Sequence, residues 1–315
     1  MSVPIVSIVI PCHNAAQWLT ETLESALAQT WPEKEIILVD DGSTDGSLEL
    51  ACGYESRGVR VLRQSNRGAA AARNAGLAAA RGDYLQFLDA DDLLSADKVS
   101  AQLTTLREAS ASSVASCRWG RFQNNPTTAV FRDTTVFRDF APAREFLVHQ
   151  ASTGDMMHPA AWLTPKAVAE AAGPWDETLS LNDDGEYFCR VLLRANTVRF
   201  SPQGSVHYRS ALPGSLSRNR SPAAMRSLYR SLELYADHLL AVEDSPRLRA
   251  ALANLWQRAC FELYPDAPDL STGARCRALG LGRPTVAFPF GPKLRWIAAF
   301  FGWKLARRLQ QWRQG

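Results

Sequence analysis

The stretch YLQFLDADD, residues 84–92, runs from an apolar segment directly into three carboxylates. The apolar segment has the composition of a strand that is buried on both faces, as strands in parallel sheets are. Two carboxylates ~5 Å apart repel each other by ~3 kcal/mol at an effective dielectric constant of about 20. The acidic end therefore requires a compensating cation, unless the three side chains form a solvated turn, in which Asp is common.

The residues before this stretch predict a parallel α/β sheet. Strand and helix patterns alternate four times in the first 92 residues, with connections short enough for right-handed crossovers. Asn14 is the expected N-cap of the first helix, and Pro32 is its expected end. Three more buried strands are predicted at residues 6–10, 35–39 and 59–62, with helices at residues 15–30, near Leu48 and after Gly68.

Polar loops follow three of these strands, at Pro11–Asn14, Asp40–Asp45 and Asp89–Asp92. Ligands of doubly wound sheets bind outside the carboxyl ends of the strands, so we expect the three loops to meet at one edge. Carboxylates there suit a hard cation, Mg²⁺ or Mn²⁺, which in turn would hold a diphosphate. Asp40 could accept a hydrogen bond from a nucleotide base or form an Asx turn. Arg73 could reach phosphate or ribose, or be a surface arginine.

The rest of the chain is less regular. The length of 315 residues and the 46% hydrophobic content permit a large domain with an appendage. We divide the chain into a first domain, 1–220, with halves 1–96 and 97–220, and a helical region, 221–315. In the first domain beyond residue 97 we expect irregular strands at 114–140, helices at 143–150 and 185–194, and a loop from 201 that runs to 223. In the helical region we expect helices over most of 223–263 and Pro/Gly-rich irregular sequence at 264–292.

Composition limits the classes of function and partner. Lys and Arg total 35 against 32 Asp and Glu, a net charge of +3, which gives no general case for nucleic-acid binding. The six cysteines are scattered without a CxxC pair, and no signal peptide is recognisable at the start. We therefore expect reduced thiols in a cytoplasmic protein. No apolar run is long enough to span a bilayer.

Several segments together resemble a known family. SIVIPCHNAAQWLTETLESALAQT (7–30), EIILVDDGSTDGS (35–47) and NRGAAAARNAGLAAARGDYLQFLDADD (66–92) resemble the amino-terminal half of a family 2 glycosyltransferase with the GT-A fold. The similarity is dense over residues 5–94 and resumes at GPWDETLSLNDDGEYFCRVLLR, residues 173–194. It is faint between these segments and absent beyond about residue 220.

This resemblance implies a doubly wound, Rossmann-like mixed sheet flanked by helices, to which the helical pattern beyond residue 220 adds a helical C-terminal appendage. It also implies transfer of a sugar from a nucleotide-diphosphate donor, usually UDP or dTDP, with inversion at the anomeric carbon. The acceptor would be a hydroxyl of a glycan or a lipid-linked acceptor, in cell-surface polysaccharide synthesis. In this family pattern Pro11 lines the base pocket, Asp40 contacts the pyrimidine, Arg73 lies near the nucleotide, Asp89 touches the ribose and Asp91 ligates the metal.

The second matching segment carries the implied catalytic base, Asp184, with Asp183 as second choice. The dipole of the helix that begins there would keep Asp184 ionised, and a simple N-cap is the alternative. His207 could complete the metal site, although a lone His is more often packed or exposed. His13 stands where the family often has Tyr, which leaves the packing of the base open.

Three more features allow a functional and a plain interpretation. The loop at 210–220 could close over the diphosphate, with Arg218 or Arg220 on phosphate, or be a solvated linker. Trp162 and Trp175 could stack on an acceptor sugar, but core packing is favoured. The segment 293–315 has six basic residues and no acidic one. It could lie peripherally on a membrane that carries a lipid-linked acceptor, or dock on the protein.

Other classes of function stay open at this point. A sugar nucleotidyltransferase would need a glycine-rich phosphate loop after the first strand, where this chain has Pro11–Asn14. A catalytically dead nucleotide-sugar-binding module is opposed, but not excluded, by the presence of Asp91 and Asp184. A receiver domain is disfavoured, since it would carry its acidic pair after the first strand.

Overall fold

A computed structural model of the chain describes residues 3–212, 215 and 218–312. Its main sheet has the order β3-β2-β1-β4-β7, in which β1 to β4 are parallel and β7 is antiparallel. The predicted doubly wound, mixed sheet is therefore confirmed. The strands are β1 Val6–Cys12, β2 Lys34–Asp41, β3 Val59–Gln64, β4 Tyr84–Phe87 and β7 Thr164–Pro165.

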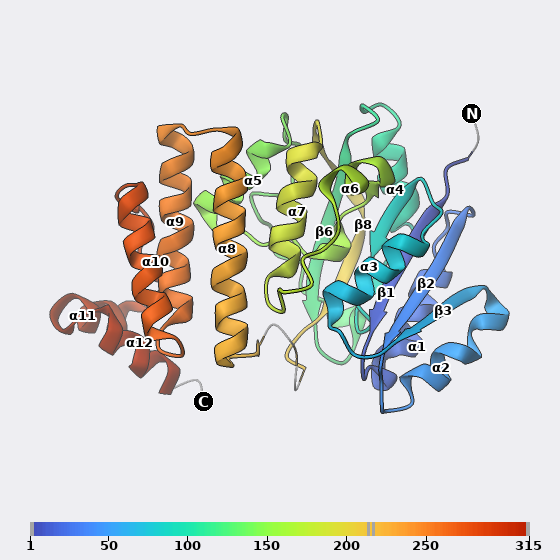
Figure 1. Cartoon of the computed structure of the whole chain (residues 1–315), viewed down its shortest axis with the longest axis horizontal. Coiled ribbons are helices and arrows are strands. Elements are labelled where there is room, and N and C mark those ends of the chain that lie inside the picture. The colour runs from blue at the N-terminus through green and yellow to red at the C-terminus, as the bar shows by residue number, and fades with distance from the viewer. Residues whose placement is uncertain (1–2, 213–214, 216–217, 313–315) are drawn as a thin grey trace.

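Helices cover both faces of this sheet, which explains why the central strand β1 and the middle of β2 are apolar and buried. Leu19 and Leu23 of α1 share one apolar cluster with Ile8 of β1, whereas Ala72 of α3 shares another with Val39 of β2. Figure 1 shows α3 in front of the sheet. The connecting helices are α1 Ala16–Leu27, α2 Ser47–Gly53 and α3 Ala69–Ala79, with a 3-10 turn at Glu55–Arg57.

The start of α1 differs from the prediction that Asn14 caps it. Asn14 has a left-handed backbone, φ 51°, and its side-chain oxygen accepts a hydrogen bond from the N–H of Thr44. The first free N–H groups of α1 are bound instead from the loop after β2. Ser47 Oγ accepts from Ala15 N–H at 2.8 Å and Asp45 from Ala16 N–H at 3.0 Å. Residues distant in sequence thus replace a local cap.

A second sheet of three strands continues from the acidic end of β4. Its order is β5-β8-β6, with β8 antiparallel to β5 and parallel to β6. The loop predicted at 201–223 is wrong over 201–209, where β8 pairs with β6 and, at Val206 and His207, also with β5. The strands are β5 Leu93–Leu94, β6 Val114–Phe122 and β8 Val198–Arg209.

Helix α7, Asp183–Arg194, begins at the second matching segment. Its predicted apolar face is buried, with Tyr187, Phe188, Val191 and Leu192 inside. Asn182 precedes it in a left-handed conformation, φ 61°, without a side-chain cap. The other elements of this half are α4 Lys98–Leu106, α5 Arg144–Thr153, α6 Lys166–Ala172 and 3-10 turns at Pro126–Thr128 and Pro159–Ala161.

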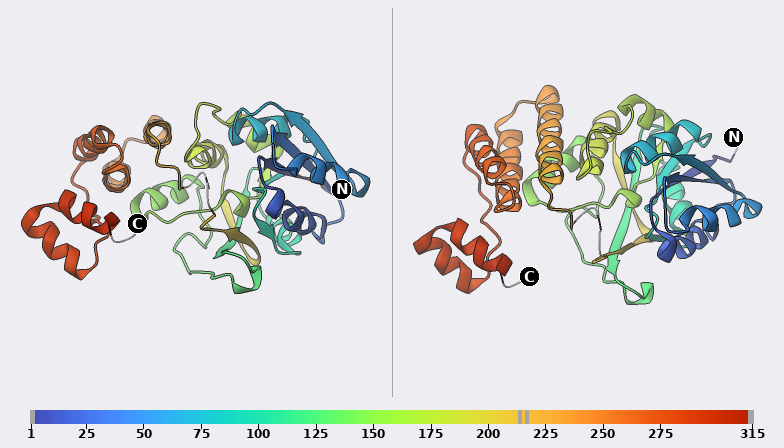
Figure 2. Two further views of the ribbon diagram at one scale, coloured as in Figure 1. Left: turned by 90° about the horizontal axis from the view of Figure 1, so that it is seen from below. Right: turned by 60° about the horizontal axis from the view of Figure 1, so that its bottom comes forward.

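The C-terminal region is helical, as predicted, and extends to the end of the molecule opposite β3 and α2 (Figures 1 and 2). Helix α10 lies in sequence that we expected to be irregular, since it contains Gly273 and Gly280. Pro268 starts it at a position where the missing N–H costs nothing. The basic segment at the end of the chain forms two helices, separated at Gly302 with φ 85°. The helices are α8 Pro222–Val242, α9 Pro246–Leu263, α10 Pro268–Leu281, α11 Pro292–Phe301 and α12 Trp303–Trp312. Across the described ranges, every helix is too short or too polar to cross a bilayer.

Candidate functional site

The polar loops after β1 and β2 meet, as their positions predicted. Asn14 joins them, since its backbone N–H donates to Ser43 Oγ at 3.0 Å and its side chain accepts from Thr44. Pro11 is buried at the end of β1 and lies opposite Val39 in the parallel register. The acidic loop after β4 is tied to α1, because Thr22 donates to the carbonyl oxygen of Ala90 at 2.9 Å.

Asp40 ends the apolar part of β2 and is only 2% exposed. Its Oδ2 accepts from the N–H of Ser43 at 3.3 Å, while its Oδ1 is buried without a hydrogen-bond partner among the described residues. An unpaired buried acceptor costs about 1–3 kcal/mol, so this oxygen suits an incoming N–H donor. Its neighbour Asp41 has a different task, since it accepts the N–H groups of Arg67 and Gly68 and so sets the start of α3.

Arg73 connects two distant parts of the chain. One guanidinium nitrogen lies 2.8 Å from Asp89, in the loop after β4, and another lies 2.8 Å from Asp183, at the start of α7. The guanidinium also lies over the ring of Trp175, 4.5 Å from its centre. Burial works against this charge, but Asp89 and Asp183 raise the pKa of Arg73 above its usual value. The arginine predicted near the nucleotide therefore joins the acidic loop to the helix that carries Asp184.

The three carboxylates after β4 differ in how their charge is compensated. Burial alone would raise the pKa of Asp89, but Arg73 and then His158 bring it below its usual range. Asp92 is fully buried, which raises its pKa, and it lies 3.0 Å from Nε2 of His158. Asp91 has no side-chain hydrogen bond or ion pair to another described residue. Burial, Asp92 and Asp89 raise the pKa of Asp91 to about 8.

His158 is the histidine that the structure brings to the carboxylates. One ligand atom each of Asp89, Asp92 and His158 lies within 4.8 Å of the others, and Asp91 and His207 do not belong to this set. His158 Nδ1 accepts a hydrogen bond from the N–H of Ala160 at 3.2 Å. We therefore assign the proton of the neutral ring to Nε2, which faces Asp92. In this tautomer His158 is a donor to Asp92 and not a free metal ligand.

Asp91 fits a divalent cation better than the histidine does. Carboxylate oxygens are the protein ligands that Mg²⁺ and Mn²⁺ prefer, and Mg²⁺ uses few of them beside water and phosphate. Asp91 is the acidic group of the loop that lacks a positive partner in the described part of the chain. A cation there would offset the burial and the repulsion from Asp92 and Asp89 that raise its pKa. The residues present therefore fit a metal held mainly through Asp91.

His207 lies on β8 two residues before Arg209, the residue of this strand that contacts the acidic loop. It is paired with Leu93 of β5, and its Nδ1 lies 3.3 Å from the carbonyl oxygen of Pro126. Burial lowers the pKa of His207. Its ring packs edge-on against Phe131, with centroids 5.3 Å apart. Ligation of the metal by His207 stays a prediction.

Arg209, in contrast, touches the acidic loop directly. Its backbone N–H donates to Asp92 at 2.8 Å, and its Nε donates to the carbonyl oxygen of Asp91 at 2.9 Å. The buried guanidinium lies between the rings of Trp18 and Phe122, at 4.3 and 4.5 Å, and also binds Glu21 at 2.6 Å. This arginine holds the loop in place from β8, a role that sequence analysis did not assign.

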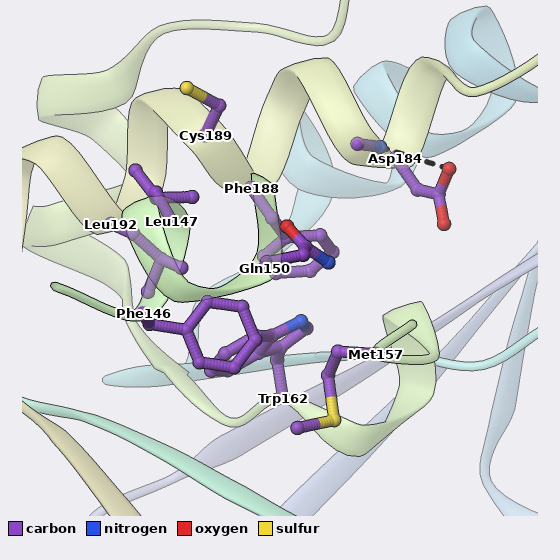
Figure 3. A pocket seen from close by; sticks show the side chains of 10 residues that line it. Phe146, Leu147, Gln150, Met157, Trp162, Asp184, Phe188, Cys189 and Leu192 are labelled. Carbon is purple, nitrogen blue, oxygen red and sulfur yellow. Dashed lines mark hydrogen bonds between the residues drawn. The ribbon is translucent and has the colours of Figure 1, made fainter. Parts of the chain in front are cut away.

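Asp184 lies in the first turn of α7 and was expected to stay ionised because of the helix dipole. Burial and the neighbouring Asp183 outweigh that effect and raise the pKa of Asp184 to about 6. Asp183 itself is held by Arg73, which leaves Asp184 as the freer acid. In Figure 3 the carboxylate of Asp184 stands apart from the apolar side chains around it and accepts from the N–H of Gly185 at 2.9 Å.

The cavity beside Asp184 is too small for a sugar. It measures about 20 Å³, room for about one water molecule. Trp162 borders it and is 3% exposed, and Trp175 is 1% exposed against Tyr187, so both tryptophans pack in the core. A wider hollow of about 260 Å³ lies at the start of α1 and the end of β8, lined by Gln17, Trp18, Gln123, Asn124, Ser210, Ala211 and Leu212.

The proposed lid at 210–220 is only partly described, because residues 213–214 and 216–217 lie outside the described residues. Arg218 is exposed, and Arg220 pairs with Glu262 of α9 at 2.5 Å. In this structure Arg220 therefore faces the helical region. A phosphate contact by either arginine stays a prediction.

Two residues of the site were not found from the sequence. His158, in DMMHPAAW, has Asp155 three residues before it but no second His or Cys nearby, a pattern that does not distinguish it from a packed histidine. Arg209 is two positions from the predicted His207, and the antiparallel pairing of Leu93 with His207 brings it opposite Asp91. This register could have identified Arg209 only if the pairing of β5 with β8 had been known in advance.

Comparison with known proteins gives consistent matches. The family described as glycosyl transferase family 2 matches residues 7–168. The uncharacterized glycosyltransferase EpsJ of Bacillus subtilis is 31% identical over 220 residues, covering 68% of this chain and 63% of EpsJ. A second B. subtilis glycosyltransferase, TuaG, provisionally placed in teichuronic acid biosynthesis, is 42% identical over 110 residues, covering 34% of this chain and 44% of TuaG. The chain thus spans less than two thirds of either relative.

Solved structures extend the likeness to nearly the whole fold. Residues 1–349 of TarS from S. aureus, in complex with UDP-GlcNAc, superimpose with a TM-score of 0.72. The superposition covers 98% of this chain and 92% of that chain, at 18% sequence identity. At this identity the likeness concerns the fold alone.

Proposed function

Since this chain belongs to glycosyl transferase family 2, we propose that it transfers a sugar from a nucleoside-diphosphate donor to an acceptor hydroxyl, with inversion at the anomeric carbon. The observation that carries this proposal is the contact of Arg73 with both Asp89 and Asp183. It joins the acidic loop after β4, suited to a metal and diphosphate, to the start of α7, which carries Asp184. A donor-binding edge and a candidate base therefore belong to one site.

Asp184 is the proposed general base. With its pKa near 6, the carboxylate is mostly ionised at neutral pH yet basic enough to take a proton. The acceptor oxygen attacks the anomeric carbon while its proton moves to Asp184. The bond from that carbon to the diphosphate oxygen breaks, and the nucleoside diphosphate leaves. A single displacement with the base on the face opposite the leaving group inverts the configuration, by analogy with inverting glycosidases.

A divalent cation, Mg²⁺ or Mn²⁺, is the proposed cofactor, held through Asp91, with His207 as a further candidate ligand. When bound, it would stabilise the charge that develops on the leaving diphosphate. The chain's own contribution is to keep Asp89 ionised through Arg73 and to hold the loop through Arg209. This arrangement supports a cation at Asp91 because no basic side chain among the described residues pairs with its carboxyl group.

The proposed donor is UDP- or dTDP-linked. The unpartnered Oδ1 of Asp40 supports recognition of a pyrimidine base N–H, with Pro11 beside it. Asp89 would contact the ribose and Arg73 would lie near the nucleotide. UDP-GlcNAc in the TarS complex is a donor of the proposed class, although that complex informs this chain only through its fold.

The proposed acceptor is a glycan or lipid-linked hydroxyl in cell-surface polysaccharide synthesis. The provisional place of TuaG in teichuronic acid biosynthesis supports this pathway class. We further propose a catalytic domain at 1–220 and a helical region at 221–315. We place the enzyme in the cytoplasm at the inner face of the membrane, where lipid-linked acceptors are available, with segment 293–315 in contact with that membrane.

One screen tests the proposal. The protein is incubated with UDP-, dTDP- and GDP-sugars with and without Mn²⁺, and thermal stabilisation and nucleoside-diphosphate release are followed. We expect stabilisation by a pyrimidine donor and slow metal-dependent release of its diphosphate. Asp40→Asn should weaken the preference for a pyrimidine base. Binding without any release would favour a catalytically dead module, and release of pyrophosphate from a nucleoside triphosphate and a sugar phosphate would favour a nucleotidyltransferase.

A further inference from the structure

The outer surface of α11 and α12 is apolar and unpartnered. The four exposed Trp and Phe side chains in the described part of the protein are Trp296, Phe300, Phe301 and Trp312, all on these two helices. Three of them are about 70% exposed or more, and Trp312 is 82% exposed. The rings of Trp296 and Phe300 stack with centroids 5.7 Å apart, so they form one continuous apolar ridge. Aromatic exposure on this scale marks an interaction surface.

The opposite side of the pair is fixed to the protein. Leu294 of α11 and Ala306 of α12 are buried in an apolar cluster with Phe261 and Phe290. Arg307 is 8% exposed, with its guanidinium over the ring of Phe261 at 4.3 Å. The two helices are thus a docked platform whose aromatic ridge points away from the core. The buried face of the segment corresponds to the interpretation as a docked helix. The exposed aromatic face is the one that an interfacial helix would need.

The charge around the ridge has one sign. No acidic residue occurs between Leu270 and the end of the chain, whereas Lys293, Lys304 and Arg308 of the same two helices are exposed. The charged groups of Lys304 and Arg308 also lie over the ring of Tyr264, at 5.5 and 5.6 Å. A two-fold interface with a second copy would set this basic face against itself. A surface of anionic lipid complements the same face, at about 1 kcal/mol for each basic residue near the bilayer. Charge complementarity therefore selects a membrane over a second copy.

We propose that α11 and α12 form a membrane-docking platform, with Trp296, Phe300 and Phe301 in the interface and the surrounding basic residues on anionic headgroups. Trp and Phe on a basic amphipathic helix suit a position in the interfacial plane. The left-handed Gly302 lets the chain turn between the helices while both keep an outward face. The proposal deepens the proposed function in one respect, because such docking would hold the enzyme where lipid-linked acceptors are found.

The test is co-sedimentation of the full-length protein with vesicles of phosphatidylcholine or of equal parts phosphatidylcholine and phosphatidylglycerol. We expect binding to the anionic vesicles that weakens with added salt. The double variant Lys293→Gln/Arg308→Gln should partition about 30-fold less, since each charge accounts for about fivefold. Trp296→Ser/Phe300→Ser should lose binding even at low salt. Leu279→Ser/Val130→Ser, which alters exposed apolar residues elsewhere, is the matched control and should bind as the parent does.

Donor binding, read by thermal shift, is followed in every variant. Unchanged donor stabilisation beside lost sedimentation supports the platform and leaves the proposed function intact. Equal sedimentation of parent and Trp296→Ser/Phe300→Ser overturns the platform, whatever the donor does. So does concentration-dependent dimerisation that disappears in this variant while vesicle binding persists. The charge variant keeps the test valid if loss of the aromatic residues impairs folding.

Discussion

At the scale of single residues, the acidic loop shows how differently one fold treats three neighbouring carboxyl groups. Asp89 and Asp92 each have a cationic or proton-donating partner, in Arg73 and His158, whereas Asp91 has none in the described part of the chain. A carboxyl with a raised pKa holds a proton in the folded state that the unfolded chain releases. Its contribution to stability therefore falls as the pH rises from about 4 to about 8.

Replacing Asp91 should consequently stabilise the metal-free protein. We expect Asp91→Asn to raise the free energy of unfolding by roughly 1–3 kcal/mol at pH 8, and by much less at pH 4. Added Mn²⁺ should stabilise the parent more at pH 8 than at pH 5, and the variant at neither pH. Urea unfolding in EDTA and in Mn²⁺ measures both effects. A variant less stable than its parent at pH 8 would contradict this account of the loop.

As the proposed base, Asp184 should set the pH dependence of the reaction. Because the raised pKa of about 6 belongs to a base that must be ionised, transfer should rise as the pH increases through 6 and level off above about 7. Asp184→Asn should bind donor normally and lose about 10²–10⁴-fold in rate. Initial rates across pH, with donor affinity from thermal shift, test the assignment. Near-normal transfer by the Asn variant would refute it, and Asp183 would then be examined in the same way.

Arg209 should be more important for stability than a surface arginine. Its buried guanidinium donates to the Asp91 carbonyl and to Glu21 between two aromatic rings, a geometry that a lysine ammonium cannot reproduce. We expect Arg209→Lys to cost about 2–4 kcal/mol of unfolding free energy and to weaken metal-dependent donor binding. Arg118→Lys, at an exposed pair with Asp133, is the control and should change stability by less than about 0.5 kcal/mol. Equal costs for the two would show that the buried network is dispensable.

At the scale of elements, the spacing between α3 and the sheet positions Arg73. Gly76 is three residues further along α3, and a Cβ there would lie 2.3 Å from Cγ1 of Val9. Arg73 reaches Asp89 and Asp183 only while α3 lies this close to the sheet. The position of α3 against the sheet therefore depends on Gly76 having no side chain.

Gly76→Ala should push α3 outward. We expect a loss of about 1–3 kcal/mol from overpacking, and weaker donor binding as Arg73 is displaced. Gly53→Ala in α2 meets nothing within 4 Å and should be neutral or stabilise by up to about 1 kcal/mol. Chemical unfolding and donor thermal shift compare the two. A Gly76→Ala protein with unchanged stability and donor affinity would show that the helix adjusts without loss.

At the scale of the whole molecule, the C-terminal pair adds a surface to an otherwise complete fold. Removal of residues 292–315 uncovers Phe261 and Phe290, so we expect a melting temperature lower by about 5 °C. Donor stabilisation should persist, because every proposed donor residue precedes residue 221, and association with anionic vesicles should disappear. Differential scanning fluorimetry and sedimentation measure these outcomes. Unchanged sedimentation of the truncated protein would count against a membrane role for this segment.

The sequence by itself determined the parallel half of the fold and the place of the acidic loop. Both depend on local patterns, since apolar runs of strand length alternate with helical spacing, and carboxyl ends of parallel strands share an edge. The predicted fold is confirmed, and the roles of Pro11, Asp40, Arg73, Asp89, Asp91, Asp184 and His207 stay predictions. Helix α10 was missed because its glycines lower the local helix propensity. Packing of α10 against α9 stabilises the helix in spite of them, and this packing is not visible in the sequence.

Only the tertiary structure decided which side chains complete the site. His158 and Arg209 reach the acidic loop through a 3-10 turn and an antiparallel register, and neither is visible in a local pattern. The raised pKa of Asp184 could not be predicted for the same reason, because it comes from burial and from Asp183, whereas sequence alone can recognise only the helix dipole. Periodicity encodes what neighbours in the chain do, whereas burial, charge pairing and strand register depend on residues that only folding brings together.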